Sequence, residues 1–262
     1  MVFGVKGEVF EGVKCINGKG FGMSGHSKWA TIKRKKGATD AKRAKIFTKI
    51  GREIAVAVRA GGGDPDTNSK LRDVVAKARA NNMPNDNVTR CIKKAEGSGD
   101  GANYEEITYE GYGPKGVAVI VETMTDNKNR TAADVRHAFD KCGGNLGQSG
   151  CVSYLFDHVG VIMIETEGID EDALAEDALE CGIEDIDFSE GLCEIKTTIK
   201  DFGNVCAELE GKGYTFADAE IAFAPQTYTA LSDERDITFM NKLIEMLEDN
   251  DDVQNIWHNW EE

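Results

Sequence analysis

The sequence predicts an α+β protein in which an N-terminal three-helix basic domain precedes two α/β domains, the last one inserted and ferredoxin-like with the order βαββαβ. Charge divides the 262-residue chain, because residues 23–96 hold 18 Lys and Arg against 7 Asp and Glu, whereas residues 97–262 hold 10 against 37. Apolar residues recur with a helical period in the basic part and alternate as in strands from Tyr104 onward. The length leaves room for two or three domains with real cores.

Three amphipathic helices are predicted in residues 23–97. Helix starts are marked by residues whose side chains accept hydrogen bonds from free backbone N–H groups, and helix ends by glycine or proline. A Gly-Gly-Gly-Asp-Pro run stops the first helix, and Pro84 stops the second. The predicted boundaries are a first helix capped by Thr39 or Asp40 and ending near Arg59, a second from its cap Asn68 to about Asn81, and a third from Asn85 or Asp86 through Ala95.

The first of these helices has an apolar face and a cationic face. At about 100° per residue, its apolar residues fall in one arc and its cations in another. The apolar arc predicts the core of a small bundle and holds Ile46, Phe47, Ile50, Ile54, Ala57 and Val58. The cationic arc is expected to be exposed and holds Lys42, Lys45, Lys49, Arg52 and Arg59. Replacing its cations by glutamine is therefore expected to leave thermal stability nearly unchanged.

The basic part points to a polyanionic partner, and nucleic acid is the expected one. Its candidate ligands are Lys28, Trp29, Lys33, Arg34, Lys35, Lys36, Lys42, Arg43, Lys45, Lys49 and Arg52. An ordinary solvated surface is the alternative for any single cation, and Trp29 can either stack on a base or pack against the bundle. The set as a whole favours binding, because acidic residues are scarce here and abundant in the rest of the chain.

The acidic part is predicted to form one α+β domain with a second domain inserted into it. The host domain's predicted elements are strands at 107–112 and 117–125, a helix at 131–141, a strand at 151–156, a strand near 227–231, a helix at 233–247 and a strand at 253–258. The predicted elements of the inserted domain are a strand at 160–165, a helix at 171–181, strands at 183–188 and 192–197, a helix at 202–212 and a strand at 214–223. This order is that of a split βαβ, ferredoxin-like fold.

These elements divide the chain into domains and termini. Residues 23–97 form the basic helical domain, residues 104–157 and 225–262 the α+β domain, and residues 158–224 the inserted ferredoxin-like domain. Residues 1–22 hold six glycines and no sustained apolar period, so they are predicted to be a disordered and dispensable extension.

Short motifs give no support for catalysis. The G-x-G-x-x-G pattern at residues 111–116 runs into a strand, so it indicates a hairpin turn and not a nucleotide-binding loop. The run at 147–151 resembles a nucleophile elbow, but its fifth residue is cysteine and a helix precedes it. The histidines have no metal-ligand spacing. The sequence therefore predicts a protein that is not an enzyme, with no catalytic residue, metal ligand or cofactor.

Two polar segments leave alternatives open. Residues 126–131 can hold an anion at a helix N-terminus, or they are an ordinary loop with Asn129 or Thr131 as the capping residue. The acidic run at 248–252 lacks the glycine and the terminal glutamate of a calcium loop, so it is interpreted as solvated helix-end and turn residues.

Cysteine usage and hydropathy indicate the cell compartment. The seven cysteines are scattered and contain no C-x-x-C pair, and the opening residues lack the pattern of a signal or transit peptide. No apolar run approaches the length needed to cross a bilayer. We therefore expect a cytoplasmic protein with reduced thiols and no membrane partner.

Seven separated motifs resemble the YebC/PmpR family, in the right order from Met23 almost to the C-terminus. They are MSGHSKWATIKRKK from Met23, Arg52-Glu-Ile54, Gly62-Gly-Asp-Pro65, Asn82-Met-Pro84, YEGYGP from Tyr109, TDNKNRT from Thr125 and LEDNDDVQ from Leu247. The resemblance implies a helical domain followed by two α/β domains. For bacterial members it implies a probable DNA-binding transcriptional regulator, and for mitochondrial relatives a translational activator. A further implication for members of the family is a ribosome-associated factor that helps synthesis through difficult peptide sequences.

Two functions follow from the residues and the resemblance. The favoured one is a non-enzymatic nucleic-acid-binding regulator of gene expression, with DNA or ribosomal RNA as its partner. The alternative is a translation factor that associates with the ribosome, binds ribosomal RNA and eases difficult peptide synthesis. An enzyme would need converging acids, a metal or a nucleophile, and the spacing of residues reveals none. The chain departs from the family mainly at residues 1–22 and at the aromatic tail 257–262, and neither touches the basic domain.

Overall fold

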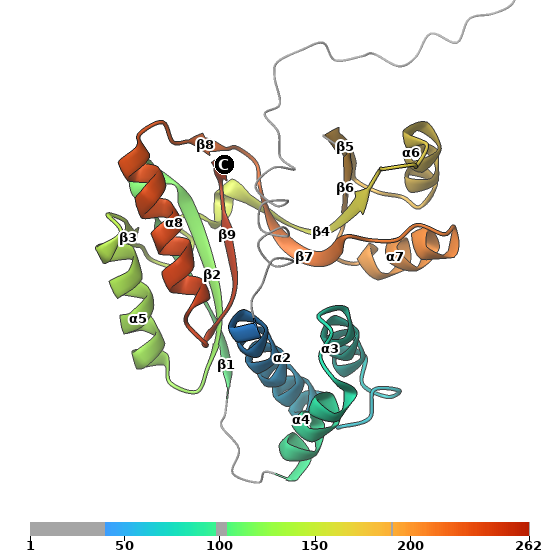
Figure 1. Cartoon of the computed structure of the whole chain (residues 1–262), viewed down its shortest axis with the longest axis horizontal. Helices are drawn as coiled ribbons and strands as arrows, with labels where there is room; N and C mark the ends of the chain where they lie inside the picture. Colours follow the sequence, from blue (N-terminus) through green and yellow to red (C-terminus); the bar gives the residue numbers. More distant parts are fainter. Residues whose placement is uncertain (1–39, 98–103, 190, 262) are drawn as a thin grey trace, which may run out of the picture.

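The computed structural model describes residues 40–97, 104–189 and 191–261, without the side chains of residues 40–42 and 80. Three helices come first, and two four-stranded antiparallel sheets with their helices follow (Figure 1). The predicted fold class, a helical part followed by two α/β domains, is confirmed. The basic arm before residue 40 and the extension at residues 1–22 lie outside the described residues.

The helical part consists of α2 (Asp40–Gly61), α3 (Ser69–Ala80) and α4 (Asn85–Gly97). Its core contains every apolar residue that the periodicity of the first helix predicts, packed against α3 and α4. Asn68 is the predicted cap of α3, and its side chain accepts a hydrogen bond from the Leu71 N–H at 3.1 Å. The same side chain donates to the carbonyls of Ala57 and Gly62, both at 2.8 Å. Asn68 therefore starts α3 and holds it against the end of α2.

The first sheet has the strand order β3-β1-β2-β9. Its elements are β1 (Glu105–Tyr112), β2 (Ala118–Thr125), β3 (Asn145–Leu146) and β9 (Val253–His258). The short η1 turn (Pro114–Gly116) joins β1 to β2, as the hairpin prediction requires. The helices α5 (Lys128–Lys141) and α8 (Glu234–Glu248) pack on one face, where Val119, Val121 and Phe139 are fully buried.

The second sheet has the order β5-β6-β4-β7 and lies between two parts of the first in the sequence. Its elements are β4 (Phe156–Glu165), α6 (Glu171–Glu180), β5 (Asp185–Ser189), β6 (Leu192–Thr197), α7 (Phe202–Gly211) and β7 (Asp218–Pro225). Both helices cover one face over a core that includes Ile162, Ile164 and Ile195. This is the predicted ferredoxin-like arrangement.

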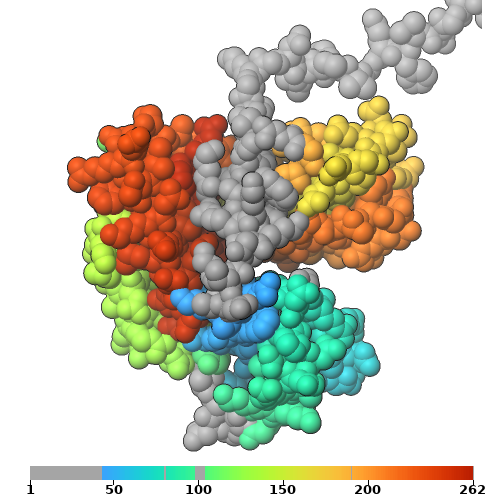
Figure 2. All heavy atoms as spheres, viewed as in Figure 1, coloured from blue at the N-terminus to red at the C-terminus, as the bar shows by residue number. Residues whose placement is uncertain are grey.

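The two α/β domains share one apolar cluster. Ala118, Ile120 and Trp257 of the first sheet lie in the same buried cluster as Val159 and Val161 of the second. The short strands β8 (Thr229–Ala230) and β10 (Trp260–Glu261) pair in parallel near the C-terminus. In the space-filling view the helical part is a separate lobe, blue to teal, beside the two α/β lobes (Figure 2).

The strand predicted at residues 151–156 is wrong. Residues Ser153–Leu155 form a 3₁₀ turn, η2, and β4 begins only at Phe156. The reason is Glu110, whose buried carboxylate accepts hydrogen bonds from the N–H groups of Gly150, Val152 and Ser153 at 2.7–2.9 Å. Burial acts to raise the pKa of Glu110, but these bonds outweigh it and hold the pKa below its ordinary value. The N–H groups are therefore not available to a sheet.

The start of α5 also differs from the prediction. Asn127 caps this helix by accepting a hydrogen bond from the Arg130 N–H at 3.1 Å, and neither Asn129 nor Thr131 is the cap. The helix consequently begins at Lys128, three residues earlier than expected. Within the described ranges, no helix is long and apolar enough to cross a membrane.

Candidate nucleic-acid interface

Three cations of the arc on α2, Lys45, Lys49 and Arg52, lie against the turn that joins α8 to β9, whereas Arg59 is exposed as expected. We call this turn, Glu248–Asp252, the acidic turn. Lys45 Nζ forms an ion pair with Asp249 Oδ1 at 2.7 Å, and Lys49 Nζ donates to the Glu248 carbonyl at 3.2 Å. Neighbouring turns of α2 therefore contact neighbouring residues of an acidic segment about 200 positions later in the sequence.

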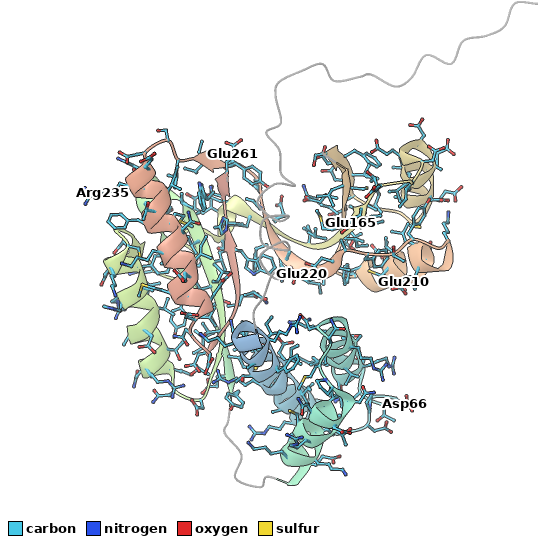
Figure 3. The ribbon with its side chains drawn as sticks, viewed as in Figure 1. Asp66, Glu165, Glu210, Glu220, Arg235 and Glu261 are labelled. Carbon is cyan, nitrogen blue, oxygen red and sulfur yellow. The ribbon has the colours of Figure 1, made fainter. Side chains whose placement is uncertain are left out.

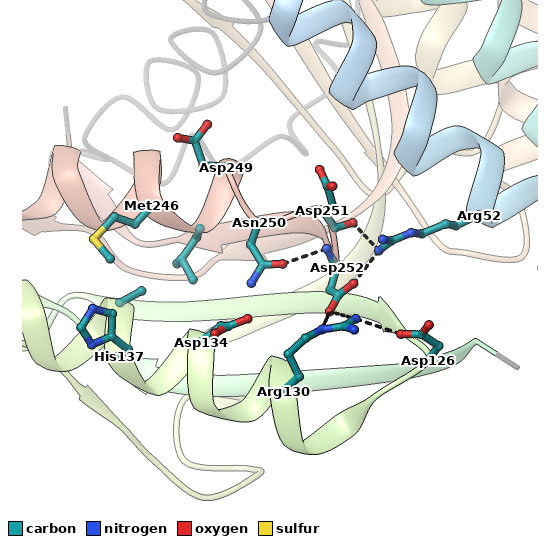
Figure 4. Close-up of a pocket in the computed structure, with 12 residues that line it drawn as sticks. Arg52, Asp126, Arg130, Asp134, His137, Met246, Asp249, Asn250, Asp251 and Asp252 are labelled. Carbon is teal, nitrogen blue, oxygen red and sulfur yellow. Dashed lines mark hydrogen bonds and ion pairs between the residues drawn. The ribbon is translucent and has the colours of Figure 1, made fainter. Parts of the chain in front are cut away.

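Arg52 makes the most buried of these contacts. Its guanidinium donates to Asp252 Oδ1 at 2.7 Å and to the Asp251 carbonyl at 2.5 Å (Figure 4). It also donates to the Met124 carbonyl at 3.3 Å. It also lies 5.4 Å from the centroid of the Tyr104 ring, within the range of a cation–π contact. Its side chain is only 16% exposed. The expected exposure of the cationic arc is therefore wrong for Arg52, because the acidic turn covers it.

Asp252 is the acceptor on which this junction centres. The residue is only 3% exposed, so the interpretation of the acidic run as solvated is wrong at this position. Its Oδ2 accepts from the Thr131 hydroxyl at 2.7 Å, from Arg130 at 2.8 Å and from the Thr125 hydroxyl at 3.1 Å. Burial acts to raise the pKa of Asp252, but these bonds and the charge of Arg52 outweigh it and hold the pKa below its ordinary value.

The polar segment at residues 126–131 combines both roles that its sequence suggests. It caps α5 through Asn127, and it also binds an anion, because Arg130 and Thr131 hold the Asp252 carboxylate. Arg130 additionally pairs with Asp126 at 2.8 Å (Figure 4). The anion bound at this helix start is therefore part of the chain itself.

A groove of about 620 Å³ lies between α5 and the acidic turn. Acidic and amide side chains dominate its lining, which includes Asp126, Asp134, Asp249, Asn250, Asp251 and Asp252 beside Arg52, Arg130 and His137. Such a lining repels phosphate, so the groove itself is a poor nucleic-acid site.

Other cations of the helical part are exposed on α3 and α4. Arg79, Arg90, Lys93 and Lys94 are exposed, and the last three are neighbours on one face of α4. Lys77 pairs with Glu53 at 2.8 Å, and Lys70 pairs with Glu106 of β1 at 3.2 Å. Acidic side chains such as Glu165 and Glu210 lie on the second α/β domain, away from the helical part (Figure 3).

The predicted nucleic-acid ligands are placed unequally. Lys28, Trp29 and the run Lys33–Lys36 lie outside the described residues, and Lys42 is described only in its backbone. Arg43 is exposed near the start of α2, whereas Lys45, Lys49 and Arg52 contact the acidic turn. Nucleic-acid binding by these residues stays a prediction.

Sequence reasoning missed the partner of the cationic arc. Nothing in the local pattern pairs α2 with residues 248–252. The charge split places the cations in one part of the chain and the anions in another, but it does not indicate which residues meet. Arg130 and Thr131 were noticed as a possible anion site, but Asp252 was not recognised as the anion. The exposed cations of α4, Arg90, Lys93 and Lys94, are not among the predicted ligands.

Burial raises the thiol pKa of each described cysteine. Burial raises the pKa of Cys193 to about 12 and that of Cys206 to about 11, which makes both thiols poor nucleophiles at neutral pH. Over the described ranges, no group of three or more His, Cys, Asp or Glu side chains is placed to hold a metal ion.

Two family descriptions match nearly all of this architecture. Residues 27–98 match the TACO1/YebC protein N-terminal domain, and residues 104–260 match the TACO1/YebC second and third domain. The chain belongs to the TACO1/YebC family, which confirms the resemblance inferred from its motifs.

Relatives with high identity extend over almost the whole chain. A protein of Ruminiclostridium cellulolyticum is 62% identical over 92% of this chain and 97% of its own length. One of Acetivibrio thermocellus is 59% identical over 91% of this chain and 99% of its own. Both are named probable transcriptional regulatory protein. The crystal structure of a conserved hypothetical protein from Aquifex aeolicus matches with a TM-score of 0.79 and 44% identity, covering 89% of this chain and 96% of that one.

Proposed function

We propose that this protein is a non-enzymatic regulator of gene expression that acts by binding nucleic acid through its helical domain. The observation that carries the proposal is the segregation of charge, a net +11 over residues 23–96 against −27 over residues 97–262. The relatives' name, probable transcriptional regulatory protein, favours transcription as the process, and DNA is the target that we propose for it.

The exposed face of α4 supplies the described part of this binding surface. Arg90, Lys93 and Lys94 lie three and four positions apart, so they project from one side of the helix. Lysine and arginine contacts to phosphate position a protein on nucleic acid without reading bases. With the predicted basic arm before α2, this face gives a mainly electrostatic and sequence-tolerant mode of binding.

The acidic α/β domains have a second role in this proposal. Their net charge repels phosphate, so nucleic acid approaches the helical lobe and not the sheets. The same domains offer surface to a protein partner while the helices hold the nucleic acid.

A salt titration of the full chain tests the electrostatic account. Fluorescence anisotropy with a labelled 20-base-pair duplex DNA is expected to give a log–log slope of affinity against salt near −5, corresponding to about five or six neutralised phosphates. Replacing Arg90, Lys93 and Lys94 together by glutamine should weaken binding and make the slope shallower by about 2 to 3.

A matched variant controls for net charge. Lys141, Lys200 and Lys242 are exposed cations of the α/β domains, and replacing these three by glutamine removes the same charge from a different surface. This control should reduce affinity far less. Equal losses in the two triple variants, or an affinity that does not depend on salt, would defeat the proposal.

Crosslinking in cells followed by sequencing of the bound nucleic acid identifies the target. Enrichment at a few promoters is the result expected of a transcriptional regulator. Recovery of ribosomal RNA alone, persisting after DNase treatment, would instead assign the protein to translation.

A further inference from the structure

The helical domain is attached to the rest of the protein by polar contacts. In the described part of the chain, no apolar cluster contains residues from both the helices and the α/β domains, although the two α/β domains share one. The attachment described above instead uses the ion pairs Lys45–Asp249, Arg52–Asp252 and Lys70–Glu106. Contacts of this kind are weakened by salt and by competing ions.

We propose that the acidic turn is an internal competitor for nucleic acid, which occupies the cationic arc of α2 and is displaced when phosphates bind there. The inference rests on the proposed function. In the docked arrangement seen here, Lys45, Lys49 and Arg52 are engaged by the chain's own oxygens. In the released arrangement, the same three cations join those of α4 on the nucleic acid.

The acidic turn presents the chemistry of a phosphate backbone to α2. It offers two carboxylates, those of Asp249 and Asp252, and three backbone carbonyls, those of Glu248, Asp249 and Asp251. The turn also lies at the C-terminal end of α8, where unpaired carbonyls carry the negative end of the helix dipole. From Lys45 to Lys49 to Arg52 the arc advances about 10 Å along α2, so these oxygens meet one cation per helical turn.

Release of α2 leaves no isolated buried charge. Asp252 keeps Arg130 and the hydroxyls of Thr131 and Thr125, all of which belong to the same α/β domain. The helical domain keeps its own apolar core, which involves α2, α3 and α4 only. Residues 98–103 are the single covalent connection between α4 and β1. The two parts can therefore separate without unfolding either.

In competition of this kind, the apparent affinity for nucleic acid equals the affinity of the released state multiplied by the fraction of molecules in that state. Weakening the docked state should consequently tighten binding. Asp249→Asn removes the ion pair to Lys45 and leaves the buried Asp252 network intact. Given the usual strength of an exposed ion pair, we expect the full chain carrying this change to bind a labelled 20-base-pair duplex DNA about two- to five-fold more tightly.

Asp134→Asn is the matched control. Asp134 is exposed and lines the same groove, and its change removes the same charge from nearly the same place, but the contacts described between α2 and the α/β domains do not use it. It should tighten binding clearly less than Asp249→Asn. Equal effects of the two variants would show that the turn acts only through net charge and would overturn the inference.

Amide hydrogen exchange supplies an independent measurement. Adding the same duplex DNA to the unchanged full chain should speed exchange in residues 248–254, because the acidic turn loses its contact with α2. Faster exchange there supports displacement, and exchange that is unchanged or slowed while DNA is bound overturns it. Absence of DNA binding by every variant would defeat the proposed function as well, whereas binding with no difference between the two variants would defeat only the competition.

Discussion

Arg52 holds the helical domain more firmly than any other described cation of α2, and replacing it by glutamine measures how much. The guanidinium makes one hydrogen bond to the Asp252 carboxylate and two to backbone carbonyls from a position that is only 16% exposed. Removing one partner of a buried ion pair costs about 3–5 kcal/mol when the remaining charge has no other partner. Asp252 retains Arg130 and two threonine hydroxyls, so we expect a smaller loss, about 2 kcal/mol.

Urea unfolding of the full chain, followed by far-UV circular dichroism, measures this loss. Arg52→Gln should lower the unfolding midpoint, and amide exchange in the acidic turn should become faster because the docked contact is weaker. Arg52→Lys keeps the charge but not the planar fork of donors, so its effect should be intermediate.

Arg79→Gln is the control for this experiment. Arg79 is an exposed arginine of α3, and its replacement should change stability by no more than about 0.5 kcal/mol. If Arg52→Gln is as stable as this control and exchange in the acidic turn is unchanged, the ion pair with Asp252 does not hold the domains together and the reasoning is refuted.

Three further predictions concern cores and carboxylates. Ile50→Ala should cost about 2–5 kcal/mol in the free energy of unfolding, because Ile50 is 1% exposed in the helical core and its truncation leaves a cavity; a loss below 1 kcal/mol would contradict this packing. Glu110→Gln should cost about 2 kcal/mol and speed amide exchange at residues 150–153, because an amide offers one acceptor oxygen where the carboxylate offers two; unchanged exchange there would argue against the anchoring role. Both Glu110 and Asp252 have folded-state pKa values below their ordinary 4.5 and 3.8, so the stability they contribute is fully present above those values and is lost as pH falls through the lowered ones. The melting temperature should therefore fall as the pH is lowered below about 4. This fall should be less steep for Asp252→Asn than for the unchanged protein, and parallel curves for the two proteins would contradict the prediction.

Local periodicity predicts the helical domain well because its core is local. The apolar arc of α2 packs against α3 and α4, all within about 60 residues, so the spacing of apolar residues carries nearly all of the information needed. The cap at Asn68 and the stop at Gly62, whose φ of +87° favours glycine, are likewise decided by the residues on either side.

The contacts of the cationic arc could not be predicted in the same way. A helical period shows that one face of α2 is charged, but water, phosphate and a distant carboxylate satisfy that pattern equally. The strand prediction is wrong at residues 153–155 for a related reason, because Glu110 on β1 accepts hydrogen bonds from the N–H groups that a strand would need. In both cases a carboxylate far away in the sequence decides the local outcome.

Helix starts with several candidate caps are a third limit of sequence reasoning. Asn127, Asn129 and Thr131 are all good capping residues within five positions. The hydroxyl of Thr131 donates to the Asp252 carboxylate and is not the cap, whereas the side chain of Asn127 accepts the Arg130 N–H. The choice depends on tertiary structure and not on intrinsic preference.

The apolar cluster between the two sheets makes the second α/β domain a structural necessity for the first. Excising residues 158–224 and joining the ends would bring the buried surfaces of Ala118, Ile120 and Trp257 into water, since these side chains pack in the same cluster as Val159 and Val161. The inserted domain is therefore not an exchangeable cassette. A shortened chain would expose an apolar patch on its remaining sheet. We expect such a chain to aggregate and not to be usable as a minimal version of the protein.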